Sequence, residues 1–189
     1  HHRRLSMDFP STPRLPLYAS KAVRAMDAEA IQRLDGQGIE LMERAGAAAF
    51  ACIKQLRPQA RTLSAMAGRG NNGGDAYIVA RLALESGWDV RLYPSDPRHA
   101  PQGDAAIAKA RYLAAGGPVL DFIPEDFEAV EILVDGLFGT GLDRAIEGQD
   151  ALIIEAANRY RERGFGHAQN RRSLIALDVP SGLHADRGC

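Results

Sequence analysis

Short apolar runs alternate with helix-length segments along most of this chain, and this alternation constrains its fold more than any other feature. Three of the runs end in small or acidic residues that open a loop. We expect strands at residues 62–67, 89–93, 119–122, 131–134 and 173–177. We expect helices between them at residues 76–86, 104–115 and 150–163. Strands that alternate with helices of this length are typical of an α/β fold, in which a mostly parallel sheet is covered on both faces.

Two further helices are expected before the first strand. Apolar residues at positions 23, 26, 30 and 34 recur at helical spacing, which predicts a helix over residues 20–35 with Ser20 as its cap. A second helix is expected over residues 39–56, and Pro58 prevents its continuation. The apolar face of this second helix includes Cys52, which we therefore expect to be buried.

The composition excludes several classes of protein. With 189 residues, 46% of them hydrophobic, and a net charge of -1, the chain is neither disordered nor basic enough for a general nucleic-acid or membrane-surface binder. It has no apolar run near the roughly 20 residues of a membrane span, and no signal peptide at its start. Two cysteines do not make a disulfide framework, so we expect a cytoplasmic protein. We expect one domain over residues 19–189, after a flexible leader or tag remnant at residues 1–18.

A glycine-rich loop at residues 68–75 carries the strongest functional signal. It follows the strand expected at 62–67 and holds four glycines together with Asn71, Asn72 and Asp75. Glycines let backbone N–H groups approach an anion, and the following helix favours negative charge at its start. We interpret this loop as a phosphate-binding site, because a tight turn needs fewer glycines.

Two more strand ends carry polar residues. Asp135 precedes a second glycine-containing loop at residues 136–142, and Arg144 beyond it could pair with a phosphate. Asp178 precedes a third loop at residues 179–182. Ligands of open parallel sheets bind beyond the carboxyl ends of strands, so we expect the three loops to meet at one crevice.

Both aspartates follow apolar strands, where a partly desolvated carboxylate is costly unless it is paired or used. Capping of the next helix is the alternative role for each of them. The oxygen atoms of Asn72, Asp135 and Ser181 could also enclose a hard cation, which prefers such ligands.

Together these motifs resemble the NAD(P)H-hydrate epimerases, the YjeF N-terminal domain family. The resemblance runs from about residue 19 to 188 and rests on three segments in order, at residues 70–75, 134–142 and 178–183. Residues 26–27 and 41–46 are similar to its two leading helices. The family domain continues with a further strand segment, so the resemblance implies that the C-terminal end of the domain is missing.

The resemblance implies a Rossmann-like three-layer αβα sandwich with a mostly parallel sheet and two leading helices. It implies an isomerase that interconverts the R and S forms of NADHX and NADPHX, the C6-hydrated forms of NADH and NADPH, in nicotinamide nucleotide repair. It also implies a homodimer, and a fused or separate ADP- or ATP-dependent NAD(P)H-hydrate dehydratase that consumes the S form. No nucleic-acid or membrane partner is implied.

The resemblance also assigns residues. It implies that Asp178 is the acid/base at the nicotinamide ring and that Asn72, Asp135 and Ser181 hold a potassium ion, K+. The residues that it implies for substrate binding are Asn71, Asn72, Gly73, Gly74, Asp75, Gly139, Thr140, Gly141, Leu142, Asp143, Arg144, Ala145 and Asp178.

Two other functions compete with this one. A non-catalytic nucleotide-binding scaffold of the same fold is the first, and retention of Asn72, Asp75, Asp135 and Asp178 favours an enzyme over it. A nucleotide-dependent oxidoreductase on an ordinary Rossmann fold is the second. It requires an acidic residue about 20 positions after the glycine loop, and it does not explain the two later motifs.

Overall fold

We describe the chain from a computed structural model. The structure describes residues 18–34, 37–96, 100–123, 125, 127–142, 145–164 and 172–188. Nearly all of the expected leader, together with Asp143 and Arg144 of the expected substrate site, lies outside the described residues.

Four parallel strands form the sheet at the centre of the domain. They are β1 (Thr62–Ala67), β2 (Asp89–Pro94), β3 (Ile132–Gly136) and β4 (Ser173–Ala176), in the spatial order β2-β1-β3-β4. The register pairs Met66 of β1 with Asp135 of β3, so the loops after these strands begin side by side. The prediction of a strand at residues 119–122 is wrong. This segment makes a single isolated bridge, between Leu92 and Val119.

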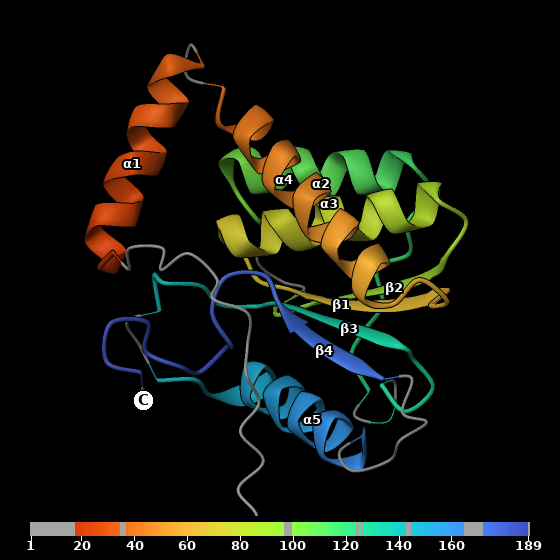
Figure 1. Cartoon of the computed structure of the whole chain (residues 1–189). Helices are drawn as coiled ribbons and strands as arrows, with labels where there is room; N and C mark the ends of the chain where they lie inside the picture. The colour runs from red at the N-terminus through yellow and green to blue at the C-terminus, as the bar shows by residue number, and fades with distance from the viewer. Residues whose placement is uncertain are drawn as a thin grey trace, which may run out of the picture.

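Helices cover both faces of the sheet. Helices α2 (Gly38–Leu56), α3 (Asn71–Glu85) and α4 (Gly103–Ala114) lie on one face, and α5 (Gly148–Gly164) lies on the other (Figure 1). The predicted three-layer αβα sandwich is therefore confirmed. No helix in the described part of the chain is long and apolar enough to cross a membrane.

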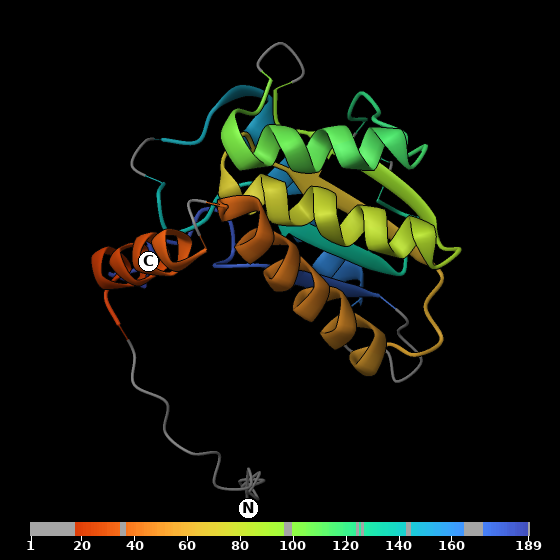
Figure 2. The same ribbon diagram turned by 90° about the horizontal axis from the view of Figure 1, so that it is seen from above.

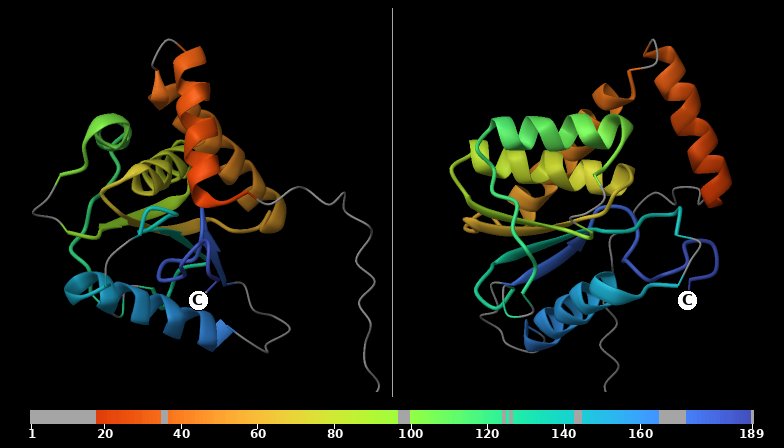
Figure 3. Two further views of the ribbon diagram at one scale, coloured as in Figure 1. Left: turned by 90° about the vertical axis from the view of Figure 1, so that its left-hand side faces the viewer. Right: turned by 180° about the vertical axis from the view of Figure 1, so that it is seen from behind.

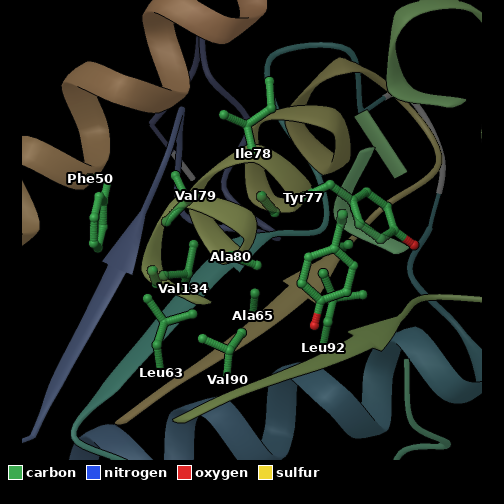
Figure 4. Close-up of a cluster of buried hydrophobic side chains, with 14 of the residues drawn as sticks. Phe50, Leu63, Ala65, Tyr77, Ile78, Val79, Ala80, Val90, Leu92 and Val134 are labelled. Atoms are coloured by element: carbon green, nitrogen blue, oxygen red, sulfur yellow. The ribbon is translucent and has the colours of Figure 1, made fainter. Parts of the chain in front are cut away.

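Two apolar clusters hold the layers together. The larger lies between the sheet and α2–α4, where side chains from α3 such as Val79 and Ala80 face Leu63 and Val90 of the strands (Figure 4). The smaller lies between the sheet and α5 and centres on Met66, Tyr93, Phe127, Leu133, Ile153 and Tyr160. The central strands β1 and β3 are buried on both faces, which explains why they are largely apolar runs.

The face that α2 buries differs from the expected one. Cys52 is exposed, and the buried residues are Met42, Gly46, Phe50 and Ile53. The expectation that Cys52 is buried is therefore wrong. The physical reason is close contact at Gly46, where an added Cβ would lie 2.5 Å from Cγ2 of Ile78 in α3. The absence of a side chain brings this face of α2 against α3 and turns Cys52 outward.

Helix α1 (Ser20–Arg33) stands apart from the three layers (Figures 2 and 3). Its first residue does not cap it as expected, because Ala19 occupies the N-cap position and makes no side-chain cap bond. Instead, the backbone N and Oγ of buried Ser20 donate to Oδ1 of Asp186, at 2.8 and 2.9 Å. These two hydrogen bonds hold the pKa of Asp186 below its usual value, and the bond from the backbone N–H has the larger effect. They tie the start of α1 to the segment that follows the third polar loop.

Candidate active site

A cavity of about 580 Å³ lies at the carboxyl ends of β1, β3 and β4. Its volume is within the range of small-molecule sites. Its walls come from α1 and from the three loops that the sequence predicted to meet. The lining residues are Val23, Arg24, Asp27, Arg69, Gly70, Asn71, Asn72, Asp75, Ser95, Leu137, Phe138, Gly139, Thr140, Gly141, Leu142, Leu177 and Asp178.

The first glycine loop is built for close backbone contact. The N–H of Gly68 donates to the carbonyl of Gly136 at 3.0 Å. A Cβ at Gly68 would lie 1.9 Å from the carbonyl oxygen of Leu137, and a Cβ at Gly73 would lie 1.9 Å from that of Gly68. None of the four loop glycines has a positive φ. Space, rather than unusual backbone conformation, is therefore what requires glycine at positions 68 and 73.

Helix α3 starts inside this loop, five residues before the position expected from the sequence. Asn71 is its first residue, and both Asn71 and Asn72 line the cavity. The first N–H groups of a helix have no partners within the helix and carry its positive end. The start of α3 therefore offers an anion-binding surface on the cavity wall.

The second and third loops meet at Asp178. The N–H of Thr140 donates to Oδ2 of Asp178 at 2.8 Å, and a Cβ at Gly139 would lie 2.4 Å from the same oxygen. The carboxylate is exposed to the cavity, so the expectation that its strand end desolvates it is wrong. The strand ends at Ala176, two residues before Asp178, so Asp178 lies on the loop beyond the sheet.

Asp135, in contrast, is buried below the cavity. Its Oδ2 accepts from the N–H of Ser181 at 2.8 Å, and its Oδ1 accepts from Oγ of Ser181 at 2.6 Å. Oγ of Ser181 in turn accepts from the N–H of Phe138 at 3.0 Å. The second and third loops are therefore joined by a buried carboxylate and a hydroxyl.

The residues implied for potassium fit a cation of this kind. Nδ2 of Asn72 donates to the carbonyl of Phe138 at 2.9 Å, which leaves its Oδ1 buried and without a hydrogen-bond partner among the described residues. Carboxylate, amide, hydroxyl and carbonyl oxygens are the ligands of hard cations. Within the described residues, no group of three or more His, Cys, Asp or Glu side chains could hold a metal ion. The amide and hydroxyl of Asn72 and Ser181 would therefore have to complete such a site.

Comparisons with known proteins agree with this geometry. Residues 38–189 match the family model described as YjeF-related protein N-terminus. The chain belongs to this family. It is 35% identical over 179 residues to an NAD(P)H-hydrate epimerase of Rhodopirellula baltica, covering 92% of this chain and 68% of that protein. The resemblance stated from the sequence motifs is confirmed.

Longer relatives and a solved structure complete the comparison. A bifunctional NAD(P)H-hydrate repair enzyme, Nnr, of Escherichia coli is 36% identical over 178 residues, which cover 94% of this chain but only 32% of that enzyme. The crystal structure of yeast ynu0, YNL200c, matches with a TM-score of 0.75 at 22% identity, covering 92% of this chain and 74% of that one. This likeness supports the YjeF N-terminal fold.

Among the carboxyl groups that the structure describes in this YjeF-family domain, Asp75 has the pKa that its surroundings raise most. Its Oδ1 is buried and has no hydrogen-bond partner in the part of the chain that the structure describes. Burial, followed by the charges of Asp178 and Asp27, raises the pKa of Asp75 to about 7. The sequence singled out Asp75 for substrate binding only. No sequence pattern indicates desolvation at this position, since burial depends on how elements distant in sequence pack around α3.

Helix α1 also supplies cavity residues that the sequence did not single out for the site. Val23, Arg24 and Asp27 line the cavity, and Nη1 of Arg24 donates to the carbonyl of Thr140 at 3.2 Å. The only signal was the similarity of residues 26–27 to a leading helix of the family. Among the predicted site residues that the structure describes, Gly73, Gly74, Asp135, Ala145 and Ser181 do not line the cavity.

The raised pKa of Asp75 predicts a pH-dependent stability. Between about pH 4 and the folded pKa of about 7, the folded protein retains a proton that the unfolded chain has released, so stability falls as pH rises through this window. Asp75→Asn removes the charge and should raise the free energy of unfolding at about pH 8 by on the order of 2 kcal/mol. Urea unfolding at several pH values measures the difference. The difference in unfolding free energy between Asp75→Asn and the parent should vanish at about pH 4. A difference at about pH 4 equal to that at about pH 8 contradicts the prediction.

Proposed function

We propose that this chain interconverts the R and S forms of NADHX and NADPHX in nicotinamide nucleotide repair. One observation carries this proposal: the anion-binding start of α3 and the carboxyl group of Asp178 share a single cavity. A dinucleotide hydrate needs both, since its pyrophosphate is anionic and its hydrated ring must exchange a proton. The names of the relatives, NAD(P)H-hydrate epimerase and NAD(P)H-hydrate repair enzyme, support the proposal.

The proposed substrate lies across the cavity. Its pyrophosphate would lie at the N–H groups of Asn71 and Asn72, where the helix favours negative charge. Gly139, Thr140, Gly141 and Leu142 of the second loop, also proposed to bind the substrate, line the same cavity. The nicotinamide end would then lie at Asp178.

Asp178 is the proposed acid/base. C6 of the hydrated ring carries a hydroxyl group on a carbon bonded to the ring nitrogen, so the nitrogen lone pair assists departure of that hydroxyl. A carboxyl group can protonate the departing oxygen, and a carboxylate can accept a proton from the returning water. The N–H of Thr140 holds the Asp178 carboxyl group in place for this role.

A potassium ion is the proposed cofactor, held by Asn72, Asp135 and Ser181. When bound, it would supply positive charge at the floor of the cavity. The three side chains connect the first, second and third loops, so a cation held there would fix the loops relative to one another.

Asp135→Asn tests this cation site. Asparagine keeps the shape and one acceptor oxygen but removes the charge, so binding of potassium should weaken and activity should fall. The melting temperature of the parent should rise with added potassium chloride, compared with matched tetramethylammonium chloride. The rise should be absent in Asp135→Asn. A parent whose melting temperature and activity are the same in both salts contradicts the potassium proposal.

The function itself is tested with the two hydrate epimers. Each separated epimer of NADHX and NADPHX is incubated with the protein, and the two forms are resolved by chromatography. We expect each epimer to convert to the same mixture much faster than in buffer. Binding of the hydrates without acceleration would instead favour the non-catalytic scaffold. Addition of an ADP- or ATP-dependent dehydratase should then allow both epimers to be consumed, which is the coupling suggested by the bifunctional relatives.

A further inference from the structure

Epimerisation at C6 requires proton transfers that a single carboxyl group does not easily provide. If the C6 hydroxyl departs from one face of the ring and water returns to the other, protons must be handled on both faces. A carboxyl group fixed on one side reaches only the oxygen on that side. The proposed function therefore calls for a second proton-transfer group in the cavity.

Asp75 has the position that such a group requires. It projects from the first turns of α3, whereas Asp178 is carried by the loop after β4, and both line the same cavity. The two carboxyl groups are close enough for the charge of one to perturb the other. Oδ1 of Asp75 is buried with no hydrogen-bond partner among the described residues, so a proton donor or acceptor is in place there without a structural task.

We propose that Asp75 is the second acid/base of the epimerisation and acts on the face of the ring opposite Asp178. The proposal rests on the proposed function. In one direction Asp75 gives its proton to the departing C6 oxygen, the C6–O bond breaks, and the nitrogen lone pair forms the N1–C6 double bond. Water then attacks C6 from the other face, gives its proton to Asp178, and restores the lone pair to N1. The reverse direction exchanges the two roles, and solvent returns the protons.

In the first direction Asp75 must start with a proton, and its surroundings favour the protonated form. Asp75 is mostly buried, and its pKa of about 7 leaves much of it protonated near neutral pH. Asp178 is exposed to the cavity, and its Oδ2 accepts a hydrogen bond from the N–H of Thr140 at 2.8 Å. Other charged groups that line the cavity are Asp27 and Arg24 from α1 and Arg69 from the first loop. Of these, Asp27 raises the pKa of Asp75.

Asp75→Asn, measured against the parent enzyme, tests the proposal. We expect epimerisation to slow by about 10²–10⁴-fold, while Asp75→Glu retains part of the rate. The parent rate should fall as pH rises above about 7, because Asp75 then loses its proton. Asp27→Asn should move this fall to lower pH. Glu85→Gln, a matched change on α3 outside the cavity, should leave both rate and pH profile as in the parent.

Labelled water provides the second readout. In oxygen-18 water the parent should incorporate one solvent oxygen at C6 for each inversion, whereas inversion by ring opening and reclosure would retain the original oxygen. Retention of the original oxygen overturns the proposal, as does an Asp75→Asn variant with near-parental rate and pH profile. A slow Asp75→Asn variant whose pH profile is parental also overturns it, since Asp75 is then structural. A parent that does not interconvert the epimers overturns the proposed function and this inference with it; the other outcomes concern Asp75 alone.

Discussion

Asp178→Asn should slow epimer interconversion by about 10²–10⁴-fold and leave the melting temperature unchanged. Asparagine keeps the shape and can still accept the hydrogen bond from the N–H of Thr140 at 2.8 Å. The change therefore removes proton transfer and little else. Exchange between the two hydrate peaks, measured alongside a thermal melt, checks the result.

Two outcomes separate the acid/base role from a structural one. If Asp178 merely holds the second loop through Thr140, Asp178→Asn should lose a little stability and a little rate together. Thr140→Ala keeps the backbone N–H that donates to Asp178 and serves as the matched control. An Asp178→Asn variant that equilibrates the epimers at near-parental rate removes Asp178 from the mechanism.

Gly73→Ala should lower the free energy of unfolding by at least about 3 kcal/mol and abolish substrate binding. Its Cβ would lie 1.9 Å from the carbonyl oxygen of Gly68, and backbone atoms on both sides of this contact have little freedom to move. Relief would require the first loop to shift away from the start of α3, which also dismantles the anion-binding surface. Urea unfolding and binding of NADPH hydrate measure the two losses.

Gly70→Ala is the control for this clash. A Cβ at Gly70 meets nothing within 4 Å, and its φ of -93° suits any residue. Gly70 is the N-cap of α3, where alanine is less favourable than glycine, so a loss of no more than about 1 kcal/mol is expected. Equal losses in the two variants would mean that the contact between positions 68 and 73 is not what requires glycine.

The sequence predicted the central strands well because β1 and β3 are buried on both faces. The short apolar runs at residues 62–67 and 131–134 are typical of strands in a covered parallel sheet, and both are strands. The meeting of the three polar loops followed from the same rule, since the carboxyl ends of parallel strands share one edge. The start of α3 was missed because Gly73 and Gly74 are poor helix formers, and only tertiary contacts explain their place in its first turn.

The electrostatics of the site could not be predicted in the same way. The sequence placed the desolvated carboxyl groups at the strand ends, and Asp135 is indeed buried. Asp178 is exposed, however, and Asp75 is the group with the raised pKa. Besides burial, the charges of Asp178 and Asp27 raise this pKa, and both residues are far from Asp75 in sequence. The register of one helix against another likewise decided the exposure of Cys52.

Helix α1 forms a wall of the cavity, and its docking should also affect substrate binding. It precedes residues 38–189, which match the family model, and its hydrogen bonds to the domain come from Ser20 to Asp186 and from Arg24 to Thr140. Its two anchors therefore flank the loop that carries Asp178. A substrate that orders these loops should strengthen the docking of α1, and by thermodynamic reciprocity the docked helix should then strengthen substrate binding to the same extent. Hydrogen exchange of the α1 backbone amides should therefore become slower when substrate occupies the cavity.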